Sequence, residues 1–447
     1  MAEIENTPPV PRPAARAFDK FLGVCPLLGV IAAGMAVALH DGSSTEIRLD
    51  ELLPSLRLLW RHPFALLALL QFAYLVLQTV LWLRYRPFAP GGDETLPSVT
   101  VVIPAYNEGP MVERSIESAL RSDYPADRLE VIAVDDGSRD DTFFHMERLR
   151  RRHPESVRLV RFAGNRGKRA ALEAGFRVAR GEVIVTIDSD SEVERGTLRA
   201  MVAPFRDAKV GAVAGKVSVL NRSTFIGAML DVQYTLAFDF QRAAQSAYRT
   251  VAVCPGALSA FRREVILPHL PEWLDQRFLG RPVAHGEDQA LTNIVLHAGY
   301  DTVYQSNAVI HTLAPTHYRQ LSKMFLRWER SYVVEGFSFA RFMFTRYRDH
   351  NRVLPVITFF IANLRLVFLY TGLVQTPLLL LERPARVADL AIAVAVSGTV
   401  TAAYHLRKDR SLRFTYGLVY AFYSLLFLQW ILPWAVVTAR DERWGTR

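Results

Sequence analysis

The chain has 447 residues, a formal net charge of +9 and two cysteines, and half of its residues are hydrophobic. This length exceeds one small domain and allows a sizeable core together with membrane segments. The distant Cys25 and Cys254 argue against a disulfide framework and a zinc site. Basic residues gather beside apolar segments, so the charge does not indicate a nucleic-acid partner.

The N-terminal part is predicted to be a disordered segment followed by membrane helices. Residues 1–17 are rich in Pro and Ala, which favours disorder. Within residues 18–86, Phe21–Leu39 and Phe64–Leu83 are apolar runs about long enough to cross hydrocarbon. The flanking basic residues place the N-terminus and the central region in the cytoplasm by the positive-inside rule; they are Arg12, Arg16, Lys20, Arg84 and Arg86.

A soluble domain is predicted over residues 96–315, after a Pro- and Gly-rich linker. Short β-branched runs alternate there with helical patterns, which indicates an α/β domain with a parallel, doubly wound sheet. Such sheets bind ligands beyond the carboxyl ends of their strands. The predicted strands are Val99–Ile103, Glu130–Val134, Val157–Val160 and Val183–Ile187, and the predicted helices are Met111–Arg121, Thr142–Arg152 and Lys168–Ala179.

Polar motifs follow the first two strands. Tyr106 and Glu108 offer an aromatic face and polar groups where a nucleobase could rest, although a simple strand–helix turn is the alternative. Asp135 and Asp136 could accept hydrogen bonds from a base or a ribose hydroxyl. For Asp136 alone, a helix N-cap is the alternative. Lys168 opens a helix after a glycine and is a plausible anion ligand, without P-loop spacing. A solvated helix start is the alternative.

The fourth strand ends in two carboxylates, Asp188 and Asp190. Hard oxygen ligands at the mouth of a sheet suit a divalent cation bound to the diphosphate of a nucleotide. A solvated turn is the alternative for this motif alone. The series of similar strand ends favours the metal site.

Two further loops of the domain carry candidate residues. Glu287 and Asp288 form a carboxylate pair in which one acid could act as a general base on a sugar hydroxyl. An N-cap pair for the helix Gln289–His297 is the alternative. Gly256 permits close approach of the backbone to a ligand, and a buried turn is its alternative explanation.

The C-terminal region begins with interfacial helices over residues 316–350. The segment 318–332 is amphipathic and fits a helix in the membrane interface. In it, Arg327 and Trp328 could pair with a diphosphate and stack on a sugar, although Trp328 also fits an interfacial anchor. Residues 351–438 hold three apolar segments, at 354–381, 387–404 and 414–437, and Asn363 and Arg365 interrupt the first.

These motifs, in this order, resemble the processive family-2 glycosyltransferases of the hyaluronan synthase and chitin-oligosaccharide synthase type. The resemblance covers residues 98–335 and rests most on the run Cys254–Glu264, followed by Phe278–Val283 and Gly286–Asp288. The tetrapeptide Trp444–Arg447 matches the gating-loop motif of hyaluronan synthases. The resemblance implies a GT-A type mixed sheet between transmembrane helices, in a multi-pass protein of the inner (plasma) membrane.

The resemblance also implies roles for the site residues. Asp135 and Lys168 hold the uridine part of a UDP-sugar, while Asp188 and Asp190 bind the diphosphate and its Mg²⁺ or Mn²⁺. Asp288 is the implied base of a single displacement with inversion. Further implied ligands are Arg327 and Trp328 for the diphosphate and acceptor, and Trp444 and Arg447 in a cytoplasmic tail, 439–447, that closes over the nucleotide. The implied partners are UDP-sugar donors, a growing polysaccharide acceptor and the lipid bilayer.

Two positions depart from the family pattern. Met324 stands where Gln is usual, which removes a polar contact near the acceptor, and Gln289 stands where Arg is common. The sequence therefore leaves the donor sugars and the product open. A transferase that adds one sugar to a lipid carrier is the alternative within enzymes, and a catalytically dead transport or scaffold protein is the alternative of another class.

The membrane layout contains a conflict. A cytoplasmic tail requires an even number of crossings after the catalytic domain, yet three apolar segments follow it. The segment with Asn363 and Arg365 is our candidate for one that does not cross. That choice places the basic stretch 405–410 outside, against the positive-inside rule.

Overall fold

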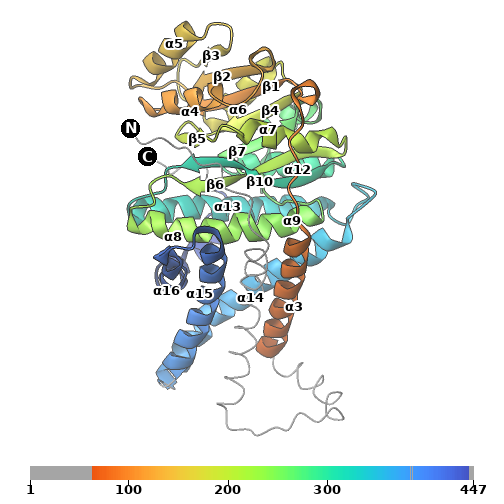
Figure 1. The fold of residues 1–447 in the computed structure, drawn as a ribbon. Coiled ribbons are helices and arrows are strands. Elements are labelled where there is room, and N and C mark those ends of the chain that lie inside the picture. The colour runs from red at the N-terminus through yellow and green to blue at the C-terminus, as the bar shows by residue number, and fades with distance from the viewer. Residues whose placement is uncertain (1–62, 383, 385, 442–447) are drawn as a thin grey trace.

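The computed structural model describes residues 63–441, apart from 383 and 385. The predictions for residues 1–17, for the apolar run Phe21–Leu39 and for Trp444 and Arg447 lie outside the described residues. The sheet domain and the apolar helices are visible together in Figure 1.

The described residues form an eight-stranded mixed sheet in the order β3-β2-β1-β4-β7-β6-β10-β5. The first four strands in this order run parallel, β7 is antiparallel to both neighbours, β6 and β10 are parallel, and β5 is antiparallel to β10. The strands are β1 (Val99–Ala105), β2 (Leu129–Asp135), β3 (Val157–Arg161), β4 (Val183–Ile187), β5 (Ser191–Val193), β6 (Val210–Val219), β7 (Leu258–Arg262) and β10 (Asp301–Thr312). A separate hairpin joins β8 (Arg277–Phe278) to β9 (Arg281–Pro282).

The central strands are apolar on both faces because helices cover both sides of the sheet. Every residue of β1 and β4 is buried. On one face, Gly175 of α6 lies so close to Val102 of β1 that a Cβ atom would stand 2.4 Å from Val102 Cγ1. The helices of this domain are α4 (Met111–Leu120), α5 (Thr142–Arg152), α6 (Lys168–Val178), α7 (Thr197–Val202), α8 (Phe225–Tyr234), α9 (Ala243–Ala247), α10 (Arg263–Ile266), α11 (Leu270–Leu274) and α12 (Glu287–His297).

The remaining helices lie at one end of the sheet domain. Figure 1 shows α8 and α13 (Tyr318–Phe342) lying across the base of the sheet, with α3 (Pro63–Arg84), α14 (Val353–Glu382) and α15 (Arg386–Asp409) projecting beyond them. The chain after α15 forms α16 (Tyr416–Tyr423), a π-helical stretch (Ser424–Leu428) and α17 (Ile431–Val437). In this arrangement the apolar helices lie beyond one end of the sheet domain.

The described residues contain fewer candidate membrane spans than the sequence predicts. Within the described residues, Leu390–Arg407 of α15 is long and apolar enough to cross a membrane. The pair Leu412–Leu428 and Ile431–Val437 adds a second candidate if its 42° bend belongs to one span. Among the residues whose side chains the structure describes, α3 and α14 contribute shorter apolar stretches, Leu69–Arg84 and Val353–Leu364.

The segment that we predict not to cross the membrane is helical in the structure. Asn363 lies in α14, where its Nδ2 donates to Phe359 O at 2.8 Å, so its side chain bonds to the preceding turn without breaking the helix. The last apolar segment contains a 42° bend between Leu412–Leu428 and Ile431–Val437. That the Asn363 segment does not cross stays a prediction.

The predicted strands and helices of the first half of the domain agree closely with the structure. β4 and α5 have the predicted bounds, and the others differ by one or two residues at their ends. The sheet is mixed, as the family resemblance implied and the strand–helix alternation did not, because β7 inserts antiparallel between β4 and β6.

Candidate active site

The strand pairing brings the predicted motifs to one edge of the sheet. Ala105 of β1 pairs with Asp135 of β2, which pairs with Arg161 of β3. On the other side, Val102 of β1 pairs with Thr186 of β4, two residues before Asp188. Since these strands are parallel, the loops that carry Tyr106, Asp135 and Asp188 all leave the sheet at the same edge.

The loop after β1 is fixed by the loop after β2. Asn107 has a positive φ of 54°, its N–H donates to Ser138 Oγ at 3.0 Å, and its Oδ1 accepts from Arg139 N–H at 2.9 Å. Glu108 N–H donates to Thr142 Oγ1 at 2.8 Å. Tyr106 keeps 37 % of its surface exposed, so its ring is available to a ligand.

Asp135 lies at the buried end of β2. Its Oδ1 accepts from Ser138 N–H at 2.9 Å, and Arg161 Nε lies 3.2 Å from Oδ2. The side chain is fully buried among protein atoms in this structure. The two interactions orient the carboxylate at the predicted nucleoside position.

Asp136 holds the loop that precedes Lys168. Its carboxylate accepts from Arg166 N–H at 2.7 Å, Gly167 N–H at 2.9 Å and Asn165 Nδ2 at 3.0 Å. Burial raises the pKa of Asp136, although the backbone donors oppose the shift. These contacts give Asp136 a part in positioning the loop, and α5 begins after Asp141, so Asp136 is not a helix cap.

Lys168 connects two carboxylates from distant parts of the chain. Its Nζ lies 2.5 Å from Asp188 Oδ1 and 3.3 Å from Glu287 Oε1. Burial disfavours the charged ammonium, but the charges of Asp188 and Glu287 outweigh it and raise the pKa of Lys168. Lys168 is therefore a cation at neutral pH, placed where a diphosphate could replace a carboxylate partner.

Asp190 follows Asp188 and Ser189 and directly precedes β5. Its Oδ1 lies 3.1 Å from Ser191 Oγ and 3.4 Å from Thr312 Oγ1, both of which can donate to it. Asp188 and Asp190 are half-buried, and Ser189 between them is buried. Both carboxylates are thus held by the protein and accessible from the site.

Glu287 and Asp288 lie side by side in the first turn of α12 with opposite electrostatic environments. Burial tends to raise the pKa of Glu287, but Lys168 and Arg327 reverse the effect, so the pKa is lowered. Burial and the neighbouring Glu287 raise the pKa of Asp288. Neighbouring carboxylates with pKa values pushed apart are typical of an acid–base site, in which the more basic group accepts the proton.

Gly256 brings the backbone against this pair. Its N–H donates to Asp288 Oδ2 at 2.8 Å. A Cβ atom at Gly256 would stand 3.1 Å from Lys168 Nζ and 3.7 Å from Asp288 Oδ2. The backbone at Gly256 therefore makes the predicted close approach, and the groups that it approaches are the Asp288 carboxylate and the Lys168 ammonium.

Asp288 is not a side-chain cap. The residue that precedes α12 is Gly286, in the left-handed conformation with φ 73°, and it makes no side-chain cap. Asp288 Oδ1 accepts instead from the next residue, Gln289 N–H, at 2.8 Å. The N-cap alternative therefore does not describe either carboxylate.

Helix α13 presents the predicted acceptor residues. Trp328 is 39 % exposed and its ring lies 5.4 Å from that of Phe325 and 6.3 Å from that of Tyr234 on α8. Arg327 is half-buried and close enough to Glu287 to lower its pKa. Arg327 thus lies near the α12 carboxylates, and Trp328 follows it in the chain.

Trp444 and Arg447 lie outside the described residues, but the chain just before them returns to the site. His285 Nε2 donates to Asp441 O at 2.8 Å, and Arg330 Nη2 lies 3.2 Å from Asp441 Oδ2. Since His285 is two residues before Glu287, the C-terminal segment reaches the same loop as the predicted base.

Several functional neighbours were not singled out from the sequence. Arg169 donates to Trp273 O and Gln276 Oε1 at 2.7 and 3.0 Å and stacks on Trp273. Glu335 of α13 is 1 % exposed and accepts from Gln276 Nε2 at 2.7 Å and Asn293 Nδ2 at 2.9 Å. A Glu on the apolar face of an amphipathic helix was the available signal for Glu335.

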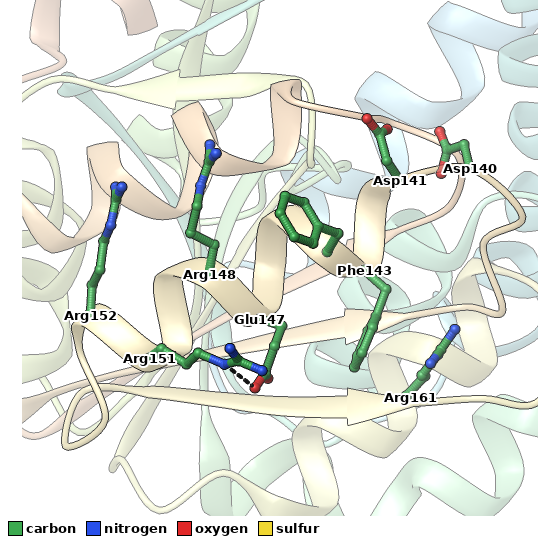
Figure 2. Close-up of a pocket in the computed structure, with 9 residues that line it drawn as sticks. Asp140, Asp141, Phe143, Glu147, Arg148, Arg151, Arg152 and Arg161 are labelled. Carbon is green, nitrogen blue, oxygen red and sulfur yellow. Dashed lines mark hydrogen bonds and ion pairs between the residues drawn. The ribbon is translucent and has the colours of Figure 1, made fainter.

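A surface pocket of about 590 Å³ lies beside this site, between α5 and β3 (Figure 2). Arg161 lines it and also contacts Asp135, so the pocket adjoins the predicted nucleoside position. The Phe143 ring lies under the Arg161 guanidinium at 4.0 Å. The lining residues are Asp140, Asp141, Phe143, Phe144, Glu147, Arg148, Arg151, Arg152 and Arg161.

The donor set at Asp188 and Asp190 fits a hard divalent cation. Both ligand atoms are carboxylate oxygens, and a nucleotide diphosphate supplies further oxygens for the six-fold coordination that Mg²⁺ requires.

Comparisons with known proteins agree with this geometry. Residues 100–267 match glycosyl transferase family 2. The chain is 31 % identical to a hyaluronan synthase of Streptococcus pyogenes serotype M1, over 84 % of this chain and 88 % of that protein. It is also 31 % identical to an N-acetylglucosaminyltransferase of Azorhizobium caulinodans, over 78 % and 87 % of the two chains.

A solved structure resembles the fold as well. It is the mannosyltransferase PcManGT from Pyrobaculum calidifontis in complex with GDP-Man and Mn²⁺. The TM-score is 0.53 at 25 % identity, over 81 % of this chain and 98 % of that one. The similarity to these enzymes over most of its length makes this chain a member of the family-2 glycosyltransferases, related to hyaluronan synthases and N-acetylglucosaminyltransferases.

Proposed function

We propose that the protein is a membrane-embedded inverting glycosyltransferase that polymerises a β-linked polysaccharide from UDP-sugars and extrudes it across the inner membrane. The product is hyaluronan-like or contains N-acetylglucosamine. The observation that carries the proposal is the joining of the donor and acceptor sides of the site: Lys168 contacts Asp188 and Glu287, and Gly256 N–H contacts Asp288.

Asp288 acts as the general base. Its raised pKa makes it a better proton acceptor than an ordinary aspartate, while Glu287 stays ionised beside Lys168. Asp288 takes the proton of the acceptor hydroxyl as that oxygen bonds to the anomeric carbon of the donor. The bond from this carbon to the diphosphate oxygen breaks in the same step, UDP leaves with the electron pair, and the configuration inverts.

The donor is held from both ends. Asp135 and Tyr106 contact the uridine, with Glu108 and Asp136 shaping the two loops around it. Asp188 and Asp190 hold the Mg²⁺ or Mn²⁺ that binds the diphosphate. When bound, this cation neutralises charge on the leaving group. Lys168 and Arg327 add positive charge at the same place.

The acceptor lies along α13. Trp328 offers an exposed aromatic face on which a sugar can stack, and Tyr234 and Phe325 support its ring. Met324, where relatives of this type usually have Gln, packs against the core of the domain. Trp444 and Arg447 follow the anchored Asp441 and close over the nucleotide from the cytoplasmic side.

The test is UDP release by the purified protein in detergent. UDP-GlcNAc, UDP-GlcA and UDP-Glc are supplied singly and in pairs with Mg²⁺ or Mn²⁺, and the products are sized. Turnover that needs both UDP-GlcNAc and UDP-GlcA, with a polymer, identifies a hyaluronan synthase, and turnover with one donor identifies a homopolymer. A single-sugar glycolipid or no turnover would overturn the proposal in favour of a lipid acceptor or an inactive scaffold.

A pair of matched variants checks the base. Asp288→Asn is expected to lower UDP release by about 10²–10⁴-fold, because it cannot accept the proton. Asp127→Asn should leave the rate unchanged, because Asp127 is exposed and precedes the start of β2, at the opposite end of the strand from Asp135. Retained turnover in Asp288→Asn with an unchanged thermal transition would remove Asp288 from this role.

A further inference from the structure

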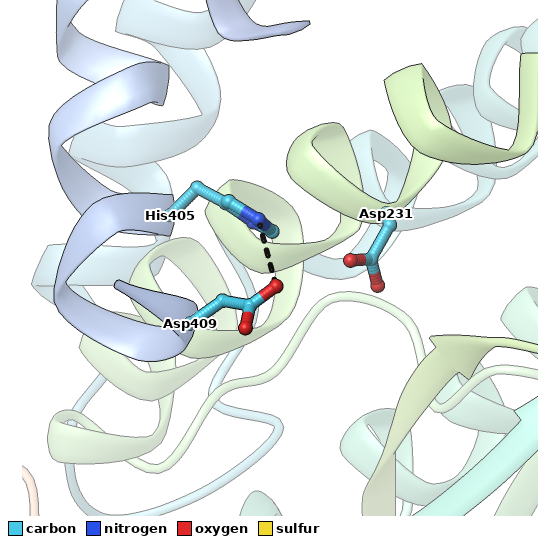
Figure 3. A group of neighbouring side chains, drawn as sticks. All are labelled: Asp231, His405 and Asp409. Atoms are coloured by element: carbon cyan, nitrogen blue, oxygen red, sulfur yellow. Dashed lines mark ion pairs between the residues drawn. The ribbon is translucent and has the colours of Figure 1, made fainter. Parts of the chain in front are cut away.

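A second group of ligand-type side chains lies away from the candidate active site, where α8 meets α15 (Figure 3). Asp231 of α8 and His405 and Asp409 of α15 each offer a ligand atom, and these atoms all lie within 4.8 Å of one another. In the part of the chain that the structure describes, this is the one group of three or more His, Cys, Asp or Glu side chains so placed.

Thr235 fixes the orientation of the histidine ring. Its hydroxyl donates to Asp231 O at 2.9 Å, so the hydroxyl hydrogen is already used. The 3.3 Å contact between Thr235 Oγ1 and His405 Nδ1 therefore requires Nδ1–H to donate. In the neutral ring this places the lone pair on Nε2, the nitrogen that lies 3.7 Å from Asp409 Oδ2.

This geometry is that of a metal-binding histidine. Such histidines donate one ring N–H to an oxygen of the protein, which selects the tautomer and aims the other nitrogen at the ion. Without an ion or an added proton, the Nε2 lone pair would face a carboxylate oxygen, which is unfavourable. His405 is fully buried, so solvent does not relieve this contact.

Asp231 supplies an independent indication. It is 1 % exposed, and neither of its carboxylate oxygens accepts a hydrogen bond from a described residue. Arg222 Nε lies 3.5 Å from Oδ1, at the long end of an ion pair. Burying a carboxylate costs on the order of several kcal/mol of folding free energy unless the group is paired or coordinates a metal. Figure 3 shows this carboxylate facing His405 and Asp409.

We propose that Asp231, His405 and Asp409 form a binding site for a divalent transition-metal ion such as Zn²⁺ or Mn²⁺, separate from the site at Asp188 and Asp190. One imidazole and two carboxylates favour such ions over Mg²⁺ and Ca²⁺, which prefer oxygen ligands alone. The two negative charges match a dication. Arg222 lies 3.5 Å from Asp231 and Arg413 lies 3.9 Å from Asp409, both at the long end of ion-pair distances.

The position of the site gives it a structural role. α15 contains the candidate membrane span Leu390–Arg407, and His405 and Asp409 lie at its end. α8 packs against β6 of the catalytic sheet. A metal ion shared by the two helices therefore ties a membrane helix to the catalytic domain.

Metal binding to the full-length protein in detergent tests the inference. The background is Asp190→Asn, which weakens the predicted catalytic site, and the probe is Zn²⁺ added after treatment with EDTA. We expect one bound Zn²⁺ per chain by elemental analysis and a higher thermal transition with Zn²⁺. Co²⁺ should give visible absorption bands of a nitrogen- and oxygen-coordinated ion.

Three variants define the ligands. His405→Gln and Asp409→Asn should each lower Zn²⁺ affinity by at least 100-fold and abolish the thermal shift. Thr235→Val keeps the side-chain shape and should lower affinity by about 10–100-fold, as for other residues that orient metal ligands. His311→Gln is the control, because His311 pairs with the single carboxylate of Glu194 and should not change binding.

Two results would overturn the inference of a metal site. If the Asp190→Asn protein binds no Zn²⁺, or if Asp409→Asn binds it with unchanged affinity, the group is an ion-pair cluster of a protonated His405 with Asp231, Asp409 and Arg222. Asp409 is exposed, so its substitution is compatible with folding and this result can be read even if His405→Gln fails to fold.

Discussion

At the scale of single residues, Glu287 and Asp288 show how one turn of helix gives two carboxylates different chemistry. Glu287 lies 3.3 Å from Lys168 Nζ, whereas Asp288 accepts from the backbone N–H groups of Gly256 and Gln289. The closer cation favours the ionised form of Glu287, and the charge of Glu287 in turn raises the pKa of Asp288. The neighbours of the two carboxylates thus favour Asp288 as the proposed proton acceptor.

This coupling predicts the pH dependence of the enzyme. Asp288 must be ionised to act as a base, so UDP release falls as pH falls through its raised pKa. Glu287→Gln removes a negative charge that raises this pKa, and the acidic limb of the kcat/KM profile should move to lower pH. The profile is measured by UDP release across pH, with the exposed Glu264→Gln as control. An unmoved acidic limb would separate Glu287 from the titration of the base.

Asp136 is predicted to act through the loop that it holds. Asp136→Asn replaces a charged acceptor of the Arg166 and Gly167 N–H groups with an amide that has only one acceptor oxygen. The expected loss of stability is about 1.5–3 kcal/mol, together with a higher KM for the donor because Lys168 follows this loop. Thermal unfolding and donor titration measure the two effects. A changed KM without a stability loss would mean that Asp136 contacts the donor directly.

At the scale of elements, the site depends on how α12 and α13 are joined. α12 carries the base and α13 carries Trp328, and the buried Glu335 joins them by accepting from Asn293 and Gln276. Ser331 Oγ also lies 3.1 Å from Gln289 Oε1, so the residue that departs from the family pattern makes a second link. These polar contacts therefore link the two helices.

Glu335→Ala tests this link. The substitution leaves the amide donors of Gln276 and Asn293 without their acceptor, at a cost of about 1–3 kcal/mol for each group. UDP release should fall together with the thermal transition, because Asp288 and Trp328 are no longer held at a fixed separation. Lys323→Ala on the same helix is the control. A stability loss with full turnover would show that the link supports the fold alone.

At the scale of the whole molecule, the chain after the apolar helices returns to the catalytic domain. Arg330 of α13 is 7 % exposed, its Nε donates to Thr438 Oγ1 at 3.1 Å, and its Nη2 contacts Asp441. His285 holds the same residue through its backbone carbonyl. This anchoring supports a tail on the side of the membrane where the nucleotide binds.

Arg330→Met should release this segment. We expect faster proteolytic loss of a C-terminal tag and a KM for the UDP-sugar raised by about tenfold, as for the loss of one charge-assisted contact of ~1.4 kcal/mol. Arg319→Met, an exposed arginine on the same helix, is the matched control. If the tag is cleaved no faster while donor affinity falls, Arg330 acts on the donor and not on the tail.

The sequence by itself determined the first half of the sheet and the motifs at its strand ends. Runs such as Val183–Ile187 are apolar throughout because the strand is buried on both faces, and the polar residues that follow mark its end. The order of strand, loop and helix then places Asp135 and Asp188 at one edge. This inference needs only local periodicity and the parallel pairing of the strands.

Only the tertiary structure decided which residues meet across long separations. The contacts of Lys168 with Glu287, of Gly256 with Asp288 and of Asp231 with His405 join elements whose sequences carry no sign of one another. The mixed order of the sheet and the bend in the last apolar segment were decided in the same way. The physical reason is that such contacts follow from packing of whole elements, whereas periodicity and local turn chemistry specify only each element alone.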